Sequence, residues 1–249
     1  MAGWDLPPGL FVMTTYDLIS IGAHPDDVEV GSGGVLIKMA QTGRKIGIIY
    51  LTAGEMGTGG DAETRRQEAQ AAADKMGADL LRTYDWGDTA LADTYERRLA
   101  LAADLRRFRP AIILCPSPWI GHGRRQSHAD HVACGQIVIN AANLASLMKV
   151  RVEGEPYRVR QLFHYFLPPG MNPHFVVDIT NQFDAWIEAL KCHRSQFLNP
   201  EKSRDYIWAL ESIARSFGMM AGVKYGQGFA ADQTLLIDDP FDLAKGDRF

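Results

Sequence analysis

Short apolar runs alternate with longer segments of helical periodicity through residues 1–150 of the chain. These runs and segments predict strands at 16–23, 45–52, 79–85 and 111–116, and helices at 33–42, 63–76, 94–108 and 129–149. Most of the strand segments are apolar at successive positions, so they are expected to be buried on both faces. Strands that alternate with helices predict a doubly wound α/β fold with a mostly parallel sheet covered on both sides.

Residues 151–249 show a different pattern. Strands are expected at 159–167 and 175–179, helices at 183–197 and 205–220, and a Gly-rich segment follows from Tyr225. We expect this part to form a C-terminal cap that shapes a substrate site on a core made by residues 1–150. The same pattern also fits the continuation of a single domain.

Composition narrows the class of protein. The chain has 249 residues, 46% of them hydrophobic, and a formal net charge of −4. This balance fits a globular protein and gives no electrostatic reason to bind nucleic acid. Cys115, Cys134 and Cys192 are too few and too scattered for a disulfide framework. There is no signal-peptide pattern and no apolar run near the roughly 18 residues that cross a membrane, so we expect a cytoplasmic protein with no membrane partner.

The first group of chemically active side chains follows the first predicted strand. Its sequence is Ala23-His24-Pro25-Asp26-Asp27. An imidazole nitrogen and a carboxylate oxygen are the ligand types that zinc accepts, and a second carboxylate could then act as a base. Pro-Asp is also a common turn, and either Asp could cap the next helix. On this segment alone, both interpretations stay open.

The second group follows the fourth predicted strand and reads His128-Ala129-Asp130-His131. Its two histidines are three residues apart, so they share one face if the helix has begun. In a Rossmann-like, doubly wound sheet with strand order 3-2-1-4, the first and fourth strands are neighbours, and a crevice opens at their carboxyl ends. Both groups are therefore expected in that crevice. Their coincidence favours a metal site over two unrelated turns.

The segment AHPDDVEVGSGG (23–34), taken with HADH (128–131), resembles the LmbE-like or PIG-L family of zinc-dependent N-acetylglucosaminide deacetylases. Segments 51–65 and 213–229 are similar to bacterial deacetylases of bacillithiol biosynthesis. The resemblance implies hydrolysis of the N-acetyl group of an N-acetylglucosamine-type substrate, with acetate and a free amine as products. It favours N-acetylglucosaminyl-malate; a chitooligosaccharide or other N-acetylglucosamine deacetylase and a thiol-conjugate amidase are the alternatives.

Two classes outside this family fit the sequence less well. A Rossmann-type nucleotide-binding protein needs a Gly-rich turn directly after the first strand, where this chain has Pro25-Asp26-Asp27. A non-catalytic zinc protein would have no use for a spare carboxylate beside its ligands.

The resemblance implies that His24, Asp27 and His131 ligate Zn²⁺, although Fe²⁺ or Co²⁺ could use the same ligands. Three protein ligands leave a position for water, as in catalytic zinc sites. Asp26 would be the general base, and a protonated His128 would stabilise the charge that develops on the acetamide oxygen.

Further roles are implied for residues outside the ligand set. Asp130 would orient His128, with helix capping as the alternative. Arg65 and Tyr225 would bind substrate; a flexible Gly-rich loop before Arg65 and a core position for Tyr225 are the alternatives. His122 is a candidate for contacting substrate, and Arg124 and Arg125 are candidates for meeting an anionic substrate group, although loop arginines are commonly solvated. The resemblance also implies a homo-oligomer, a trimer or a hexamer.

Overall fold

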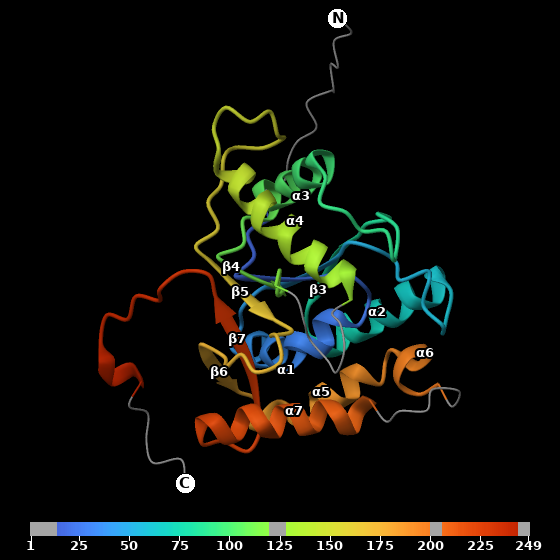
Figure 1. The fold of residues 1–249 in the computed structure, drawn as a ribbon, viewed down its shortest axis with the longest axis vertical. Coiled ribbons are helices and arrows are strands. Elements are labelled where there is room, and N and C mark those ends of the chain that lie inside the picture. Colours follow the sequence, from blue (N-terminus) through green and yellow to red (C-terminus); the bar gives the residue numbers. More distant parts are fainter. Residues whose placement is uncertain (1–13, 120–127, 200–205, 244–249) are drawn as a thin grey trace, which may run out of the picture.

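The structure is a computed structural model that describes residues 14–119, 128–199 and 206–243. At its centre lies a seven-stranded sheet with the strand order β3-β2-β1-β4-β5-β7-β6 (Figure 1). Its strands are β1 (Leu18–Gly22), β2 (Ile46–Tyr50), β3 (Asp79–Thr83), β4 (Ile112–Pro116), β5 (Gln161–Tyr165), β6 (Phe175–Asp178) and β7 (Gly226–Ala231). The α-helices are α1 (Asp27–Gln41), α2 (Ala62–Met76), α3 (Tyr95–Phe108), α4 (Ala129–Ser146), α5 (Phe183–Leu190), α6 (Arg194–Phe197) and α7 (Tyr206–Ala221).

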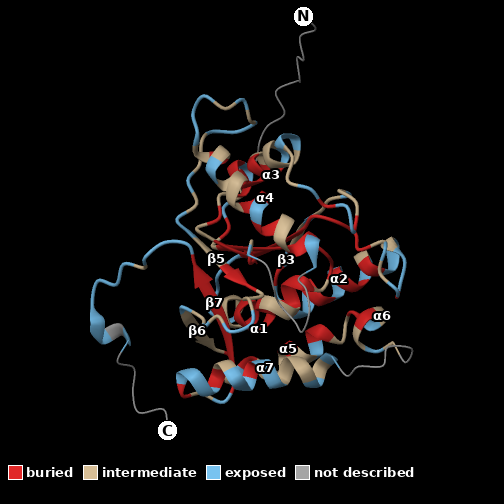
Figure 2. Cartoon of the chain, viewed as in Figure 1, coloured by how far each residue is buried: buried red, intermediate tan, exposed pale blue. Residues whose placement is uncertain are grey.

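The amino-terminal half confirms the predicted α/β fold with strand order 3-2-1-4. Leu18 of β1 pairs in parallel with Ile46 of β2 on one side and with Ile112 of β4 on the other. All residues of β1 and β2 are buried, since helices cover both faces of the sheet. Helices α3 and α4 lie on one face, and α1, α2 and α5 lie on the other (Figures 1 and 2).

Helix α1 begins at Asp27, six residues before the predicted start at Gly33. The first two turns contain Asp27, Glu29 and three small residues, which together resemble a polar loop in sequence. In the structure this segment is packed tightly. A Cβ atom on Gly31 would lie 2.1 Å from the Tyr165 ring, so α1 approaches β5 as only glycine allows.

The carboxy-terminal part extends the same sheet. Strand β5 runs parallel to β4, and β7 pairs antiparallel with both β5 and β6. The Gly-rich segment was not expected to form a strand, because glycine weakens strands. Here glycine is required by close contacts: a Cβ on Gly226 would lie 2.4 Å from Val176, and one on Gly228 would lie 3.0 Å from Phe217.

The helix predicted at 183–197 is divided in two. Helix α5 ends at Leu190, and the short helix α6 begins at Arg194. Within the part of the chain that the structure describes, no helix combines the length and apolar character needed to cross a membrane.

Candidate active site and metal centre

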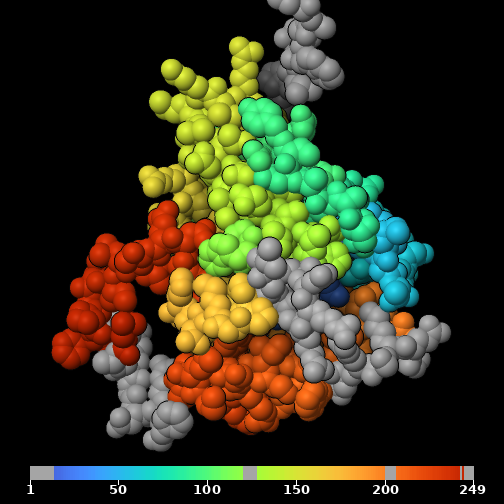
Figure 3. Space-filling view, viewed as in Figure 1, coloured from blue at the N-terminus to red at the C-terminus, as the bar shows by residue number. Residues whose placement is uncertain are grey.

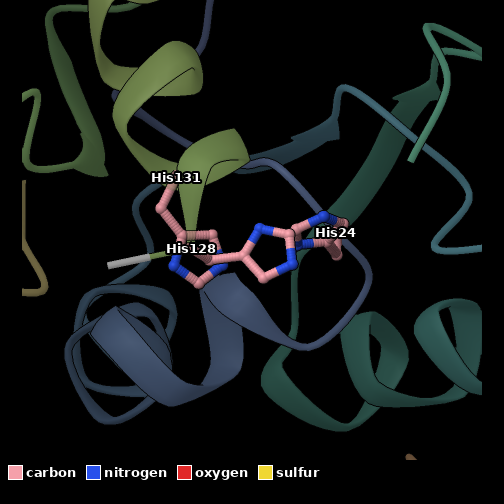
Figure 4. A group of neighbouring side chains, drawn as sticks. All are labelled: His24, His128 and His131. Carbon is pink, nitrogen blue, oxygen red and sulfur yellow. The ribbon is translucent and has the colours of Figure 1, made fainter. Parts of the chain in front are cut away.

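The two groups of polar side chains meet at the carboxyl-terminal edge of β1 and β4. His24 lies in the loop after β1, His128 is the N-cap of α4, and His131 lies in the first turn of that helix. Their rings converge (Figure 4): the centroid of His24 lies 4.7 Å from that of His128 and 5.3 Å from that of His131. The structure therefore brings the two predicted motifs together at the switch point of the sheet.

Asp27 joins the two motifs. One of its carboxylate oxygens lies 3.3 Å from Nδ1 of His24, and the other lies 2.9 Å from Nε2 of His131. All three residues are buried. We call these three residues and His128 the His–Asp cluster. His24, His128 and His131 each offer a ring nitrogen, and these nitrogens lie within 4.8 Å of one another. Together with the Asp27 carboxylate, which contacts His24 and His131, they form a donor set that suits Zn²⁺, Fe²⁺ or Co²⁺.

Two further carboxylates fix the orientation of His24. Its Nε2 atom lies 3.1 Å from Oδ1 of Asp88 and 3.1 Å from Oδ2 of Asp130. These contacts turn Nδ1 toward Asp27. A carboxylate on the outer nitrogen of a ligating histidine is a regular feature of metal sites, because it fixes the ring and increases its basicity.

The carboxylate of Asp130, predicted to orient His128, makes its contacts elsewhere in this structure. The Asp130 carboxylate contacts His24 and accepts backbone N–H groups from Thr89 at 2.7 Å and Leu91 at 3.3 Å. His128 is itself the helix cap, since its Nδ1 accepts the backbone N–H of Asp130 at 3.3 Å. Residues two apart at the start of a helix point in different directions, so the Asp130 side chain faces His24 in the loop after β1.

The charges of the cluster favour a cation at its centre. Burial alone would raise the pKa of Asp27, but the imidazoles of His131 and His24 hold it well below its ordinary value. Burial opposes the charged form of His24, yet hydrogen bonds to Asp130, Asp27 and Asp88 raise its pKa to about 12. Burial and the neighbouring His24 and His131 lower the pKa of His128. Three carboxylates, those of Asp27, Asp88 and Asp130, surround the ring of His24, and this negative charge favours a divalent cation nearby.

Asp26 differs from its neighbour. Its backbone φ is 115°, in a region that few residues other than glycine adopt, although Asp and Asn tolerate it better than most. Its side chain is 21% exposed, and one carboxylate oxygen lies 3.6 Å from Nη2 of Arg65. Burial raises the pKa of Asp26, and Arg65 opposes this effect. A carboxyl group in such surroundings suits proton transfer.

A cavity of about 750 Å³ opens in front of the cluster. Asp26 and the four residues of the His–Asp cluster line one end of it. Buried reactive groups beside a concave space of this size are typical of an enzyme site for a small molecule.

Arg65 lines the cavity, but most of its guanidinium group is used internally. It donates hydrogen bonds to the backbone carbonyls of Pro25 and Gly54. A Cβ on Gly54 would lie 2.0 Å from Nη1 of Arg65, which explains a glycine here. Arg65 thus connects the Gly-rich loop to the loop that carries Asp26, and its substrate contact stays a prediction.

Tyr225 is not among the described residues that line the cavity. Its ring stacks on Phe183 with centroids 3.6 Å apart, and its hydroxyl contacts Arg215 and Glu211 of α7. This placement matches the alternative of a core tyrosine. Residues 122–125 lie outside the described residues.

Sequence reasoning missed Asp88. Its carboxylate accepts the backbone N–H of Met56 at 2.9 Å in addition to its contact with His24. Asp88 follows β3, which lies beyond β2 in the sheet. Its position after the carboxyl end of a parallel strand was the sequence signal that could have placed it near His24. Through these two contacts Asp88 connects the Gly-rich loop to the first predicted ligand.

Comparison with known proteins agrees with this geometry. Residues 19–142 match the family described as PIG-L: GlcNAc-PI de-N-acetylase. A diacetylchitobiose deacetylase from Thermococcus kodakarensis is 31% identical over 85% of this chain and 81% of its own length. This chain belongs to the PIG-L deacetylase family.

Solved structures with a similar fold agree with this conclusion. The conserved protein TT1542 from Thermus thermophilus superimposes with a TM-score of 0.80 and 36% identity, over 89% of this chain and 97% of the other. An N,N'-diacetylchitobiose deacetylase from Pyrococcus horikoshii gives a TM-score of 0.74 and 29% identity, over 85% of this chain and 82% of the other. The fold and the family predicted from the sequence are therefore confirmed.

Proposed function

We propose that this chain is a metal-dependent hydrolase that removes the N-acetyl group from an N-acetylglucosamine-type saccharide, and that His24, Asp27 and His131 hold the metal. The observation that carries the proposal is the convergence of these three buried side chains beside Asp26 at one end of a 750 Å³ cavity. The deacetylases among its relatives support the reaction class.

A divalent cation bound there supplies Lewis-acid chemistry and makes a water molecule more acidic. Asp26 then accepts a proton from the attacking water and later delivers it to the departing amine, which leaves as the C–N bond breaks. Its position beside a ligand, with partial exposure to the cavity, suits both steps.

His128 stabilises the charge that develops on the acetamide oxygen. Because its Nδ1 atom accepts a backbone N–H, its ring proton lies on Nε2, and a neutral ring can still donate from that atom. Removing one donor of this kind commonly costs about 10²-fold to 10³-fold in kcat. The fully protonated ring expected from the sequence is not required for this role.

Two substrates follow from different observations. N-acetylglucosaminyl-malate follows from the resemblance of segments 51–65 and 213–229 to bacillithiol-pathway deacetylases. Diacetylchitobiose follows from the Thermococcus relative. Both carry an acetamide on a glucosamine ring, and they differ in the group attached to that sugar.

A panel of substrates tests the proposal. The purified protein, with Zn²⁺, Fe²⁺ or Co²⁺ added, is incubated with N-acetylglucosamine, N-acetylglucosaminyl-malate and diacetylchitobiose, and released amine is measured. We expect turnover of at least one substrate, its loss after treatment with a chelator, and its return when metal is restored. Turnover that persists at full rate in metal-free protein would contradict the proposal, as would no release from any substrate with all three metals.

A further inference from the structure

The far side of the cavity is built differently from its catalytic end. Helix α7 presents four large side chains to it at helical spacing: Tyr206, Leu210, Ile213 and Phe217. This spacing places them on one face of the helix. Segment 166–171 (FLPPGM) also lines the cavity. In Figure 3 the yellow-orange surface in this part of the chain borders the orange surface of α7. We call these four side chains and segment 166–171 the apolar wall.

The apolar wall is open to the cavity. Tyr206 is 43% exposed and Ile213 is 51% exposed, although both line the cavity. Large apolar side chains left exposed together in a concave site indicate a ligand that covers them.

The wall also reaches the catalytic end. The ring of Phe166 lies 5.0 Å, between centroids, from that of His131. Phe166 has a φ of 56°, which is rare for a bulky residue and is maintained against its conformational cost. This backbone conformation keeps an aromatic ring at the boundary between the cluster and the wall.

Charge is distributed unevenly in the cavity. The lining residues of α7 and of segment 166–171 carry no charge, whereas the charged lining residues gather around the His–Asp cluster. Arg65, at the charged end, donates to Pro25 and Gly54. Among the described residues, the apolar wall therefore has no cationic side chain that could pair with an anionic group of a ligand.

We propose that the apolar wall is a subsite for an apolar aglycone, an alkyl or aryl group attached to the amino sugar whose acetamide faces the metal. This inference rests on the proposed function. The sugar lies at the polar end, and the aglycone extends along α7.

A homologous series tests the subsite. Methyl, butyl and hexyl β-glycosides of N-acetylglucosamine are assayed with the Zn²⁺-loaded enzyme beside N-acetylglucosaminyl-malate and diacetylchitobiose. Burial of each added methylene should raise kcat/KM by up to about fourfold, mainly through KM, until the wall is filled. The hexyl glycoside should therefore exceed the malate conjugate and the disaccharide.

Two variants on one helix localise the effect. Ile213→Asn places an amide in the wall and should flatten the dependence on chain length. Met219→Asn changes a residue that is 70% exposed, is absent from the lining and lies on the same helix. This control should keep the wild-type dependence.

The outcomes separate the inference from the proposed function. If the methyl glycoside is deacetylated and the butyl and hexyl glycosides gain nothing, the subsite is wrong and the deacetylase stands. An equal chain-length dependence in Ile213→Asn and wild type would also overturn the subsite. Binding is measured in parallel by calorimetry: affinity that increases with chain length, without release of amine, supports the subsite and overturns the deacetylase.

Discussion

Asp26 and Asp27 are adjacent in sequence and yet have opposite surroundings. Asp27 contacts two imidazoles and is buried, whereas Asp26 lies beside Arg65 with its side chain 21% exposed. The backbone φ of 115° at Asp26 turns the two side chains apart. Paired carboxylates whose environments shift their pKa values in opposite directions commonly divide acid–base and electrostatic roles.

Asp26→Asn tests that division. Asparagine tolerates positive φ about as well as aspartate and keeps the shape of the side chain, but it cannot accept the proton. We expect kcat to fall by about 10²-fold or more while the metal content, measured by elemental analysis, stays at the wild-type level.

The matched control is Asp17→Asn. Asp17 lies directly before β1, at the end of the strand away from the His–Asp cluster, and its carboxylate is exposed. It should retain full activity. An Asp26→Asn enzyme within about threefold of wild type would show that another group moves the proton.

The sequence predicted which residues lie together where two short motifs carried them, while the roles of these residues stay predictions. His24, Asp27 and His131 come together as the motifs indicated. The contact of the Asp130 carboxylate with His24 was not predicted, because a contact from α4 to the loop after β1 depends on how two elements face each other. Asp88 was missed for the same reason: no pattern in its own segment indicates an imidazole 3.1 Å away.

Helix α1 carries Asp27 at its first residue, so the site depends on how this helix lies on the sheet. Tyr165 of β5 is fully enclosed there, and its hydroxyl donates to the backbone carbonyl of Ile21 at 2.7 Å. Gly31 lies directly against the same ring. The ring is held at both ends, so it has no room to retreat from a larger residue.

Gly31→Ala should therefore destabilise the fold. The added Cβ would lie 2.1 Å from the Tyr165 ring, and overpacking of this kind costs about 1–3 kcal/mol of unfolding free energy. Urea unfolding measures the loss. Gln70→Ala, at an exposed position of α2, is the control and should change the free energy by less than about 0.5 kcal/mol. Equal midpoints for Gly31→Ala and wild type would contradict this account of the packing.

Helices and strands were predicted well where a pattern of apolar residues marked their buried faces. They were predicted poorly where glycines occupy the buried positions. Strands β1, β2 and β4 followed their apolar runs. The start of α1 and the whole of β7 were missed, because Gly31, Gly226 and Gly228 allow close approach and leave no apolar side chain to reveal a buried surface. Close packing at a glycine therefore leaves no trace in the pattern of apolar and polar residues.

At the scale of the whole molecule, the site exists because β1 and β4 are neighbours although their sequences are far apart. Alternation of strands and helices predicted that order, and with it the meeting of the two motifs. The extension by β5, β7 and β6 was not predicted as part of the sheet. This extension brings segment 166–171 and α7 to the cavity. The apolar wall of the cavity therefore comes from the part of the fold that the sequence patterns predicted least well.

A metal held between β1 and β4 should stabilise the whole fold, because the proposed ligands His24, Asp27 and His131 are together only in the folded chain. With Zn²⁺ at about 100 times its dissociation constant, we expect the melting temperature of metal-free protein to rise by roughly 5–10 °C. His131→Ala should lose most of this shift. His174→Ala, an exposed histidine on another part of the surface, should keep it and so exclude unspecific binding to imidazoles. A shift of wild-type size in His131→Ala would place the metal elsewhere.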